Sequence, residues 1–539
     1  MKTERLSGVL LHPTSLPCSE GIGTLGRQAY DFIDWLESAK QSIWQILPIG
    51  PTGYGDSPYA SFSTFAGNPL LIDTAVLVDN DVLSKEEAKE PEWIKRSGNV
   101  DFGSVVWWKI PLLKKAAEHY ISLLHSSTDT HTFKDQDYCA QKYRSFCSEM
   151  TWLNEYSLFM SIKEFYDAKA QEEKIHGAMW SSYWPKKLAS HDHETVEKWE
   201  KEHKREIEIH KVIQFFFFTQ WKKLKAYANS KHIKIVGDIP IFVASDSSDV
   251  WADQPLFQLQ KNGTPKFVAG VPPDYFSATG QLWGNPLYDW DAMKKENYSW
   301  WIKRIKAMLS LVDYVRIDHF RGFEAYWSIP FGSETAIHGE WKKGPGSALF
   351  NAIKKELGSI PIIAEDLGII TDEVAELRDE FNLPGMKVLQ FAFSREEADK
   401  GAMINAFLPH EYSKNCVVYP GTHDNDTARG WFSKLSESDQ ELITSYLTSN
   451  IEGLAVTDEN LPLLFIQHAF SSVAQAAVIP LQDIYTLGSE ARMNEPSTAG
   501  GTNWQWRMSE DMLYGQRAEA KAQWLKKMSI MYDRNAKRD

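Results

Sequence analysis

Short apolar runs rich in β-branched residues recur along this 539-residue chain, and each ends in a polar or Gly/Pro segment. Such runs, when followed by apolar positions at helical spacing, are typical of parallel β/α units. Eight of them stand out: Gly8–Pro13, Ser42–Ile49, Ile233–Val243, Val312–Phe320, Pro361–Leu367, Met386–Phe393, Cys416–Pro420 and Ala476–Ile484. Eight strands with helices between them predict an α/β fold of the (β/α)8, or TIM-barrel, type.

Helical patterns lie between most of these strands: Arg27–Lys40, Val212–Ala228, Tyr298–Leu311, Ser347–Leu357, Asp372–Phe381 and Ser436–Leu447. The strands are unevenly spaced, since the stretch between the second and the third is by far the longest. We expect residues 1–539 to form a single barrel. A mostly helical insertion at 74–210 follows its second strand, and a loop-rich insertion at 244–297 follows its third. Long excursions of this kind usually form subdomains around the C-terminal face of a barrel.

The bulk composition narrows the class of partner. A net charge of -14 argues against nucleic acid, because phosphate binding needs clustered Lys and Arg. The four cysteines have no CxxC spacing and indicate reduced thiols: Cys18, Cys139, Cys147 and Cys416. No apolar stretch is long enough for a signal peptide or a membrane span, so we expect a cytoplasmic protein without a membrane partner.

One His-x-His pair, His191 and His193, lies in the charge-dense stretch 191–210. Two histidines at that spacing can ligate a metal ion. A charge-dense helical run is more often a solvated face, and we favour that interpretation. We therefore predict no metal site here.

The ends of the predicted strands carry carboxylates and few other reactive groups. The third, fourth, fifth and seventh strands lead to Asp238, Arg316, Asp318, His319, Glu365, Asp366, His423, Asp424 and Asp426. Function in a β/α barrel concentrates where strands end. Acids beside an apolar interior must be paired, solvated or catalytic.

Arg316 and Asp318 fall on the same face of the fourth strand, about 7 Å apart along it. An Arg at this distance favours the ionised carboxylate and is expected to lower the pKa of Asp318. An ionised, oriented carboxylate is what attack on an anomeric carbon requires. A structural Arg–Asp ion pair explains the same hexapeptide equally well, and the spacing alone leaves both interpretations open.

Glu365 follows the apolar run Pro361–Ala364. An apolar setting raises the pKa of a carboxyl group, as a general acid at neutral pH requires. Asp366 points the other way and is expected to bond the following loop or cap the next helix. For Asp426 we favour a loop-shaping role. Two carboxyls flanking a glycosidic bond are the minimum for retaining glycosidic chemistry, and a third can stabilise the transition state.

The 21 Trp and 21 Tyr residues include many in Gly/Pro-rich loops. Most are expected to fill the core. Those in loops suit a sugar, because flat rings with a polar edge match a ligand with apolar C–H faces and many hydroxyls.

Long motifs lie at Ser7–Pro17, Leu47–Asp73, Gly237–Ala252, Val268–Trp290, Val315–Trp327, Ile362–Gly368, Pro384–Phe393, Gly421–Asp426 and Glu490–Pro496. With these motifs the chain resembles the 4-α-glucanotransferase family (amylomaltase or disproportionating enzyme), within the α-amylase-like barrel enzymes. The GYGDSPY and VPPDYFS loops are the most specific, and the stretch 80–210 matches weakly. The family ends without a C-terminal β-sandwich, and none is expected here.

The resemblance implies Asp318 as nucleophile, Glu365 as acid/base and Asp424 as transition-state stabiliser. It also implies that the −1 sugar site is lined by Arg316, His319, His423 and Asp238. Contacts to neighbouring glucose units are implied for Ser57, Tyr59, Asp274, Trp283 and Asn494. Tyr54 is a candidate for a secondary glucan contact.

The expected activity is transfer of an α-1,4-glucan segment to the 4-hydroxyl of an acceptor through a covalent glucosyl-enzyme. The donors would be maltooligosaccharides, amylose, starch or glycogen-derived glucans, with glucose or a glucan as acceptor and no metal or organic cofactor. Three alternatives remain: an α-1,4-glucan hydrolase of the same chemistry, a metal-dependent hydrolase using the Asp/His pairs, and a non-catalytic glucan-binding protein.

Overall fold

The structure is a computed structural model. It describes residues 4–126, 133–273, 277–368, 370–393, 405–449, 453, 455–498 and 500–535. The side chains of residues 54, 125 and 126 lie outside the description. Among the described helices, none combines the length and the apolar character that crossing a membrane requires.

Eight parallel strands form the central sheet: β1 (Leu6–Leu10), β2 (Ile43–Gln45), β3 (Lys234–Pro240), β6 (Tyr314–Asp318), β9 (Ile362–Ala364), β10 (Gly385–Val388), β11 (Cys416–Tyr419) and β12 (Ala476–Pro480). Their order is β10-β11-β12-β1-β2-β3-β6-β9. The two strands at the ends of this order, β9 and β10, also meet. Ala364 N of β9 donates to the O of Pro384, directly before β10, at 2.9 Å. The predicted (β/α)8 barrel and all eight of its strands are confirmed.

The strands end earlier than their apolar runs. The run Met386–Phe393 leaves the sheet after Val388 and continues as the 3-10 helix Leu389–Phe393. The run Ala476–Ile484 likewise passes from β12 into the short helix α19 (Leu481–Ile484). Both continuations are largely buried, and a continuous apolar run does not separate a buried strand from a buried helical turn.

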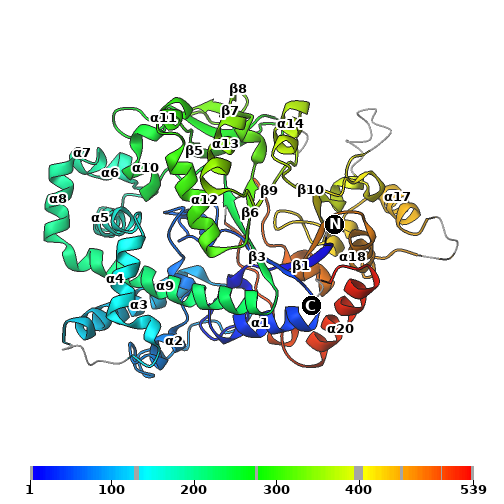
Figure 1. The fold of residues 1–539 in the computed structure, drawn as a ribbon, viewed down its shortest axis with the longest axis horizontal. Coiled ribbons are helices and arrows are strands. Elements are labelled where there is room, and N and C mark those ends of the chain that lie inside the picture. The colour runs from blue at the N-terminus through cyan, green and yellow to red at the C-terminus, as the bar shows by residue number, and fades with distance from the viewer. Residues whose placement is uncertain are drawn as a thin grey trace.

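The predicted helices are present: α1 (Arg27–Ser38), α9 (Lys204–Ser230), α12 (Ser299–Leu311), α13 (Ser347–Leu357), α14 (Asp372–Glu380) and α17 (Glu437–Leu447). Their bounds agree within a few residues except that α9 begins well before the predicted Val212. Ser436 caps α17 by accepting from Asp439 N. The others on the C-terminal half are α16 (Ala428–Ser433), α18 (Leu461–Ser471) and α20 (Gly515–Met531). Figure 1 shows α1 and α20 side by side outside the sheet.

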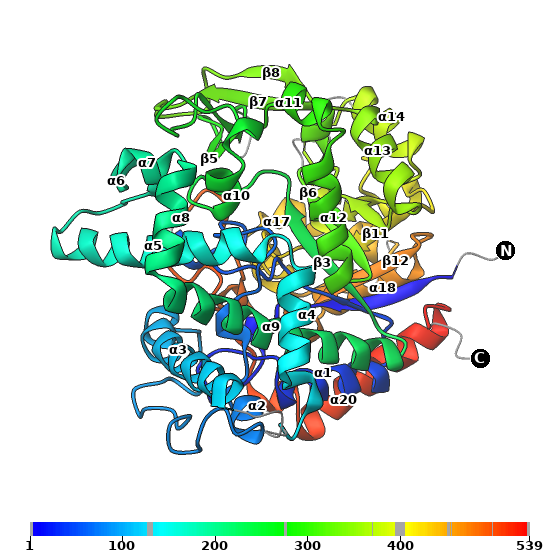
Figure 2. The same ribbon diagram turned by 60° about the vertical axis from the view of Figure 1, so that its left-hand side comes forward.

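Residues 74–210 contain α2 (Thr74–Asp79), α3 (Phe102–Ser126), α4 (Ala140–Glu149), α5 (Leu153–Glu172), α6 (Trp180–Tyr183), α7 (Lys186–Ala189) and α8 (His193–Glu202). These helices lie on one side of the barrel (Figure 2). Phe215 and Phe216 of α9 pack against a group of aromatic rings from α3 and α4. The buried Lys109 of α3 pairs with Glu20, 2.5 Å away, and so ties α3 to the segment after β1.

A second, antiparallel sheet lies beside the barrel in the order β5-β4-β7-β8. Its strands are β4 (Phe267–Val271), β5 (Gln281–Pro286), β7 (Ala325–Pro330) and β8 (Glu340–Lys343), with α10 (Ser248–Ala252) and α11 (Trp290–Lys295) in the same part of the chain. None of these strands was predicted. β8 is exposed along its length. β4 has three buried residues in a row, and its register shifts near Gly270. Neither strand therefore shows the alternation of buried and exposed positions that predicts a strand. The subdomain boundaries 74–210 and 244–297 stay predictions.

Candidate active site

Four barrel strands bring the predicted acids to one rim, formed by the C-terminal ends of the strands. Asp238 lies within β3 and Asp318 ends β6, while Glu365 directly follows β9 and Asp424 follows β11. Ile317 pairs with Ala364 in the parallel register, and Glu365 N donates to Ile317 O at 3.1 Å. Asp318 and Glu365 are therefore the next neighbours across two adjacent strands.

Arg316 holds two of these acids with one guanidinium group. Its Nη2 donates to Asp318 Oδ1 at 2.9 Å, and its Nη1 donates to Asp238 Oδ2 at 2.6 Å. Arg316 and Asp238 are buried, whereas the side chain of Asp318 is 30% exposed. The ion pair that the sequence allowed is present, and it leaves Asp318 open to the solvent side of the rim.

The expected fall in the pKa of Asp318 is wrong in its net direction. Burial raises the pKa of Asp318, and the negative charges of Asp238 and Asp424 add to that rise. Arg316 does act to lower it, as expected, but burial is the larger effect.

Glu365 is the group that holds a proton at neutral pH. Burial first, and then the negative charge of Asp318, raise its pKa to about 8, which confirms the expectation from its apolar run. Its oxygens accept from His319 N at 2.6 Å and from Leu367 N at 2.9 Å. With the pKa of Glu365 at about 8 and Arg316 bonded to Asp318, a proton shared by the two carboxyls is favoured on Glu365.

The pKa of Asp424 shifts in the opposite direction. Burial acts to raise its pKa, but His423 and Asn494 outweigh burial and lower the pKa to about 2. Asn494 Nδ2 donates to Asp424 Oδ1 at 2.6 Å, and His423 Nε2 lies 3.3 Å from Asp424 Oδ2. Asn494 N also donates to His423 O at 3.1 Å, so the three residues form one unit. Asp424 therefore stays ionised across the neutral range.

Tyr59 joins this unit to Asp238. Its hydroxyl donates to Asp238 Oδ2 at 2.8 Å, and its ring stacks on His423 with centroids 5.2 Å apart and planes 15° apart. Burial raises the pKa of Tyr59 well above 10, so the hydroxyl remains a neutral donor.

His319 has a left-handed backbone with φ of 55°, which a residue with a side chain adopts only when its surroundings enforce it. The ring of Trp283 packs edge to face with the imidazole of His319, with the ring centroids 4.8 Å apart. Burial, with Arg321 second, lowers the pKa of His319 to about 3. Within the described residues its buried Nε2 has no hydrogen-bond partner, and the lowered pKa keeps the ring neutral.

Other predicted residues are not drawn into this network. Ser57 Oγ accepts from Tyr59 N at 3.3 Å, within its own loop. Asp274 and the side chain of Tyr54 lie outside the described residues.

Asp366 has a structural role, but not the expected one: it pairs with Arg378 near the end of α14 and accepts from Met386 N of β10, instead of bonding the following loop or capping the helix. Asp426 accepts from Lys434 Nζ and Ser489 Oγ. His191 pairs with Glu155 at 2.9 Å, and the His193 side chain is almost fully exposed and near Glu197. The two histidines therefore do not converge on a shared site.

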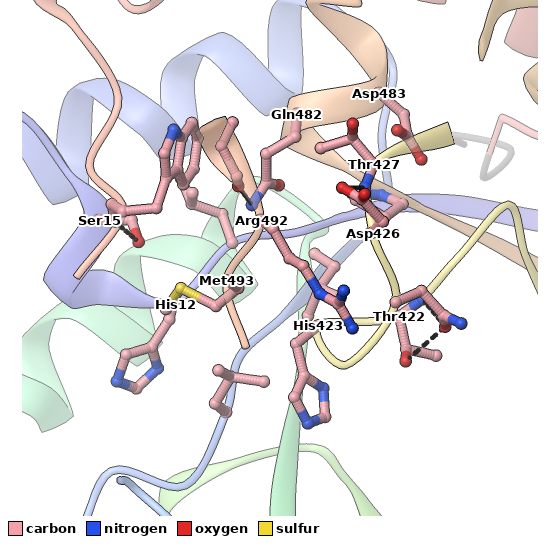
Figure 3. A pocket seen from close by; sticks show the side chains of 17 residues that line it. His12, Ser15, Thr422, His423, Asp426, Thr427, Gln482, Asp483, Arg492 and Met493 are labelled. Carbon is pink, nitrogen blue, oxygen red and sulfur yellow. Dashed lines mark hydrogen bonds between the residues drawn. The ribbon is translucent and has the colours of Figure 1, made fainter. Parts of the chain in front are cut away.

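Sequence reasoning missed two residues near Asp424. His12 follows β1, and burial lowers its pKa to about 3, with His423 the second cause. Arg492 Nη2 donates to Asp424 O at 2.8 Å and its Nε to Asn494 O at 2.8 Å. Figure 3 shows His12, His423 and Arg492 around a cavity of about 30 Å³ behind the rim. His12 could have been found, because it stands at a strand end like the predicted acids.

One group among the described residues has the spacing of metal ligands: Cys18, Glu20 and Asp73. Lys109 Nζ lies 2.5 Å from Glu20 Oε2 and already supplies a positive charge there. None of the three residues belongs to the acids at the rim.

Comparison with known proteins identifies the family to which the chain belongs. The family model described as 4-alpha-glucanotransferase matches residues 11–513. This chain belongs to the 4-α-glucanotransferase family. The 4-α-glucanotransferase of Synechocystis is 47% identical over 522 residues, 95% of each chain. That of Thermus thermophilus is 44% identical over 529 residues, 97% of this chain and 99% of the relative.

A solved structure agrees with this assignment to the family. The amylomaltase from Streptococcus agalactiae, in complex with acarbose, superposes with a TM-score of 0.88 at 36% identity, covering 99% of this chain and 100% of that one. These relatives are named as glucan transferases and not as hydrolases. Family membership therefore makes this chain a transferase and does not favour the hydrolase alternative.

Proposed function

We propose that this enzyme transfers an α-1,4-glucan segment from a donor to the 4-hydroxyl of an acceptor with net retention, using Asp318, Glu365 and Asp424. The donors are maltooligosaccharides, amylose and glucans derived from starch or glycogen, and the acceptor is glucose or another glucan. The observation that carries the proposal is the placement of Asp318, paired with Arg316, beside Glu365 on adjacent strands, with the pKa of Glu365 raised to about 8. The names of the relatives support the substrate class.

In the first step Glu365 donates its proton to the glycosidic oxygen as that bond breaks. Asp318 attacks the anomeric carbon and forms a covalent glucosyl-enzyme. Its attacking carboxylate is oriented by Arg316, which is itself fixed by Asp238. The ionised Asp424 stabilises the positive charge that develops on the sugar ring.

In the second step the same residues act in reverse. Glu365, now ionised, removes the proton of the acceptor 4-hydroxyl. The acceptor oxygen attacks the anomeric carbon and releases Asp318. Two inversions at one carbon give net retention.

Transfer requires that an acceptor sugar, and not water, meets the glucosyl-enzyme. Trp283 is 37% exposed beside the half-buried His319, whose Nε2 has no hydrogen-bond partner among the residues that the structure describes. An exposed ring next to a neutral nitrogen suits the apolar face and the hydroxyls of an acceptor glucose. We therefore assign Trp283 and His319 to acceptor binding, and Tyr59, Asp238, Arg316, His423 and Asn494 to the sugar at the anomeric centre.

The experiment uses maltotriose as sole substrate. We expect glucose and longer maltooligosaccharides with the number of reducing ends constant. A steady rise in reducing ends would show hydrolysis and defeat the proposal. Asp318→Asn should abolish turnover and keep glucan binding, which also separates the enzyme from a non-catalytic glucan-binding protein.

A further inference from the structure

A cavity of about 290 Å³ opens between the outer strand β8 and the start of α14. This is close to the lower end of the volumes that small-molecule sites occupy, about 300–1,000 Å³. Trp341, Arg321 and Thr371 are among its lining residues. Arg321 lies in the turn after Asp318, and Thr371 follows Glu365 along the chain. We call this the rim cavity, because the segments that carry the proposed nucleophile and acid continue directly into it.

The ring of Trp341 is held in place. The Arg321 guanidinium carbon lies 3.9 Å from the ring centroid, and Trp327, directly opposite on β7, packs against it at 5.2 Å. Trp341 is nevertheless 40% exposed. An exposed ring that is already fixed loses little conformational entropy on binding, and its flat apolar surface suits the C–H face of a sugar.

The charges around the rim cavity are compensated. Lys343 pairs with Glu324, and Lys342 pairs with Glu340 at 2.6 Å. An anionic ligand would therefore meet carboxylates as well as ammonium groups. A neutral ligand with many hydroxyls can bond to both kinds of group without adding charge.

We propose that the rim cavity is a second glucan-binding site, in which a glucose unit of an α-1,4-glucan stacks on Trp341. Hydroxyls of the sugar bond to Glu324 and Lys343, which line the same cavity. This proposal rests on the proposed function for its ligand class. A long glucan held there has a raised effective concentration at Asp318, so the benefit grows with chain length.

The test compares Trp341→Ala with Trp107→Ala, which removes an exposed Trp from α3, 82% exposed and outside this cavity. Affinity is measured by retardation in native gels that contain glycogen, and transfer is measured with maltotriose and with amylose. We expect Trp341→Ala to weaken glycogen affinity and raise the KM for amylose about fivefold, with a much smaller loss on maltotriose. Trp107→Ala should behave as the wild type, and Trp341→Tyr should restore most of the affinity.

Unchanged glycogen affinity in Trp341→Ala would overturn the proposal. Equal losses on maltotriose and amylose would overturn it as well, since Trp341 would then act on the fold or on the catalytic cleft. Failure of the proposed function gives a different result, because the wild type itself would then not disproportionate maltotriose. Glycogen retardation still reports on the rim cavity in that case.

Discussion

Glu365 and Asp424 stand at the same rim, and burial acts to raise the pKa of each, yet their pKa values move apart. Glu365 faces the negative charge of Asp318 and its pKa rises to about 8. Asp424 faces His423 and the Asn494 amide, and its pKa falls to about 2. The partner therefore decides the protonation state, and not burial alone. One carboxyl can then act as the proton donor while the other remains a fixed negative charge.

The largest expected effect comes from removing the proton donor. Glu365→Gln keeps the shape of the side chain but cannot protonate the leaving oxygen, so kcat on maltotriose should fall about 10²–10⁴-fold. An α-glycosyl fluoride needs no such protonation, because fluoride is a good leaving group. The first turnover, measured as a burst of fluoride from Glu365→Gln, should stay much closer to the wild-type rate, because only the second step then lacks its base. An equal loss on both donors would remove the acid role from Glu365.

Asp424→Asn tests the role of the second carboxyl, which carries a fixed negative charge. The variant keeps the size of the side chain and removes the negative charge, so kcat should fall about 10²–10³-fold. Asp426→Asn is the matched control, since Asp426 bonds Lys434 and Ser489 and not the sugar site. It should lower the melting temperature while keeping most of the activity. If the two variants lose activity equally, Asp424 has no special electrostatic role.

Asn494→Ala removes a single hydrogen bond to Asp424. A hydrogen bond to a charged group is worth about 1.5–3 kcal/mol, so kcat should fall on the order of tenfold to a hundredfold. The pKa of Asp424 should rise above about 2, which NMR of carboxyl-labelled aspartate can follow. Asn425→Ala, which frees Thr422 N in the same loop, should leave that pKa unchanged. An unchanged pKa of Asp424 in Asn494→Ala would contradict the effect of Asn494 on Asp424.

The smallest effect is a shift in the pKa of Glu365. Glu365 must be protonated to act, so kcat/KM should decline as pH rises through about 8. Asp318→Asn removes the like charge and should lower the pKa of Glu365 by about one unit. The shift can be followed by NMR of carboxyl-labelled glutamate, with Glu365→Gln used to assign the signal. An unchanged or higher pKa would contradict the coupling of the two carboxyls.

The barrel could be predicted from the sequence because strands buried on both faces read as continuous apolar runs. The antiparallel sheet could not, since β8 (Glu340–Lys343) is exposed along its length and shows no alternation of buried and exposed positions. Its packing against β7 places Trp341, and nothing local in its sequence indicates a strand.

The chemical types at the site were predictable from strand ends, and their protonation states were not. A spacing of two places Arg316 beside Asp318, but the sequence does not show how deeply the pair is buried or that Asp238 competes for the same guanidinium group. The direction of the pKa shift at Asp318 depends on this burial and on the charge of Asp238. Arg492 escaped notice for a similar reason, because it acts on Asp424 from a loop that lies far away in sequence.

The central claim is a covalent glucosyl-enzyme on Asp318, and trapping it is the most direct test. Glu365→Gln with α-maltosyl fluoride should form the intermediate and then lack the base that activates the acceptor. Rapid denaturation, intact-mass measurement and peptide mapping should find one maltosyl unit on the peptide that contains Asp318. Fluoride release without any adduct, or an adduct on another residue, would contradict the account.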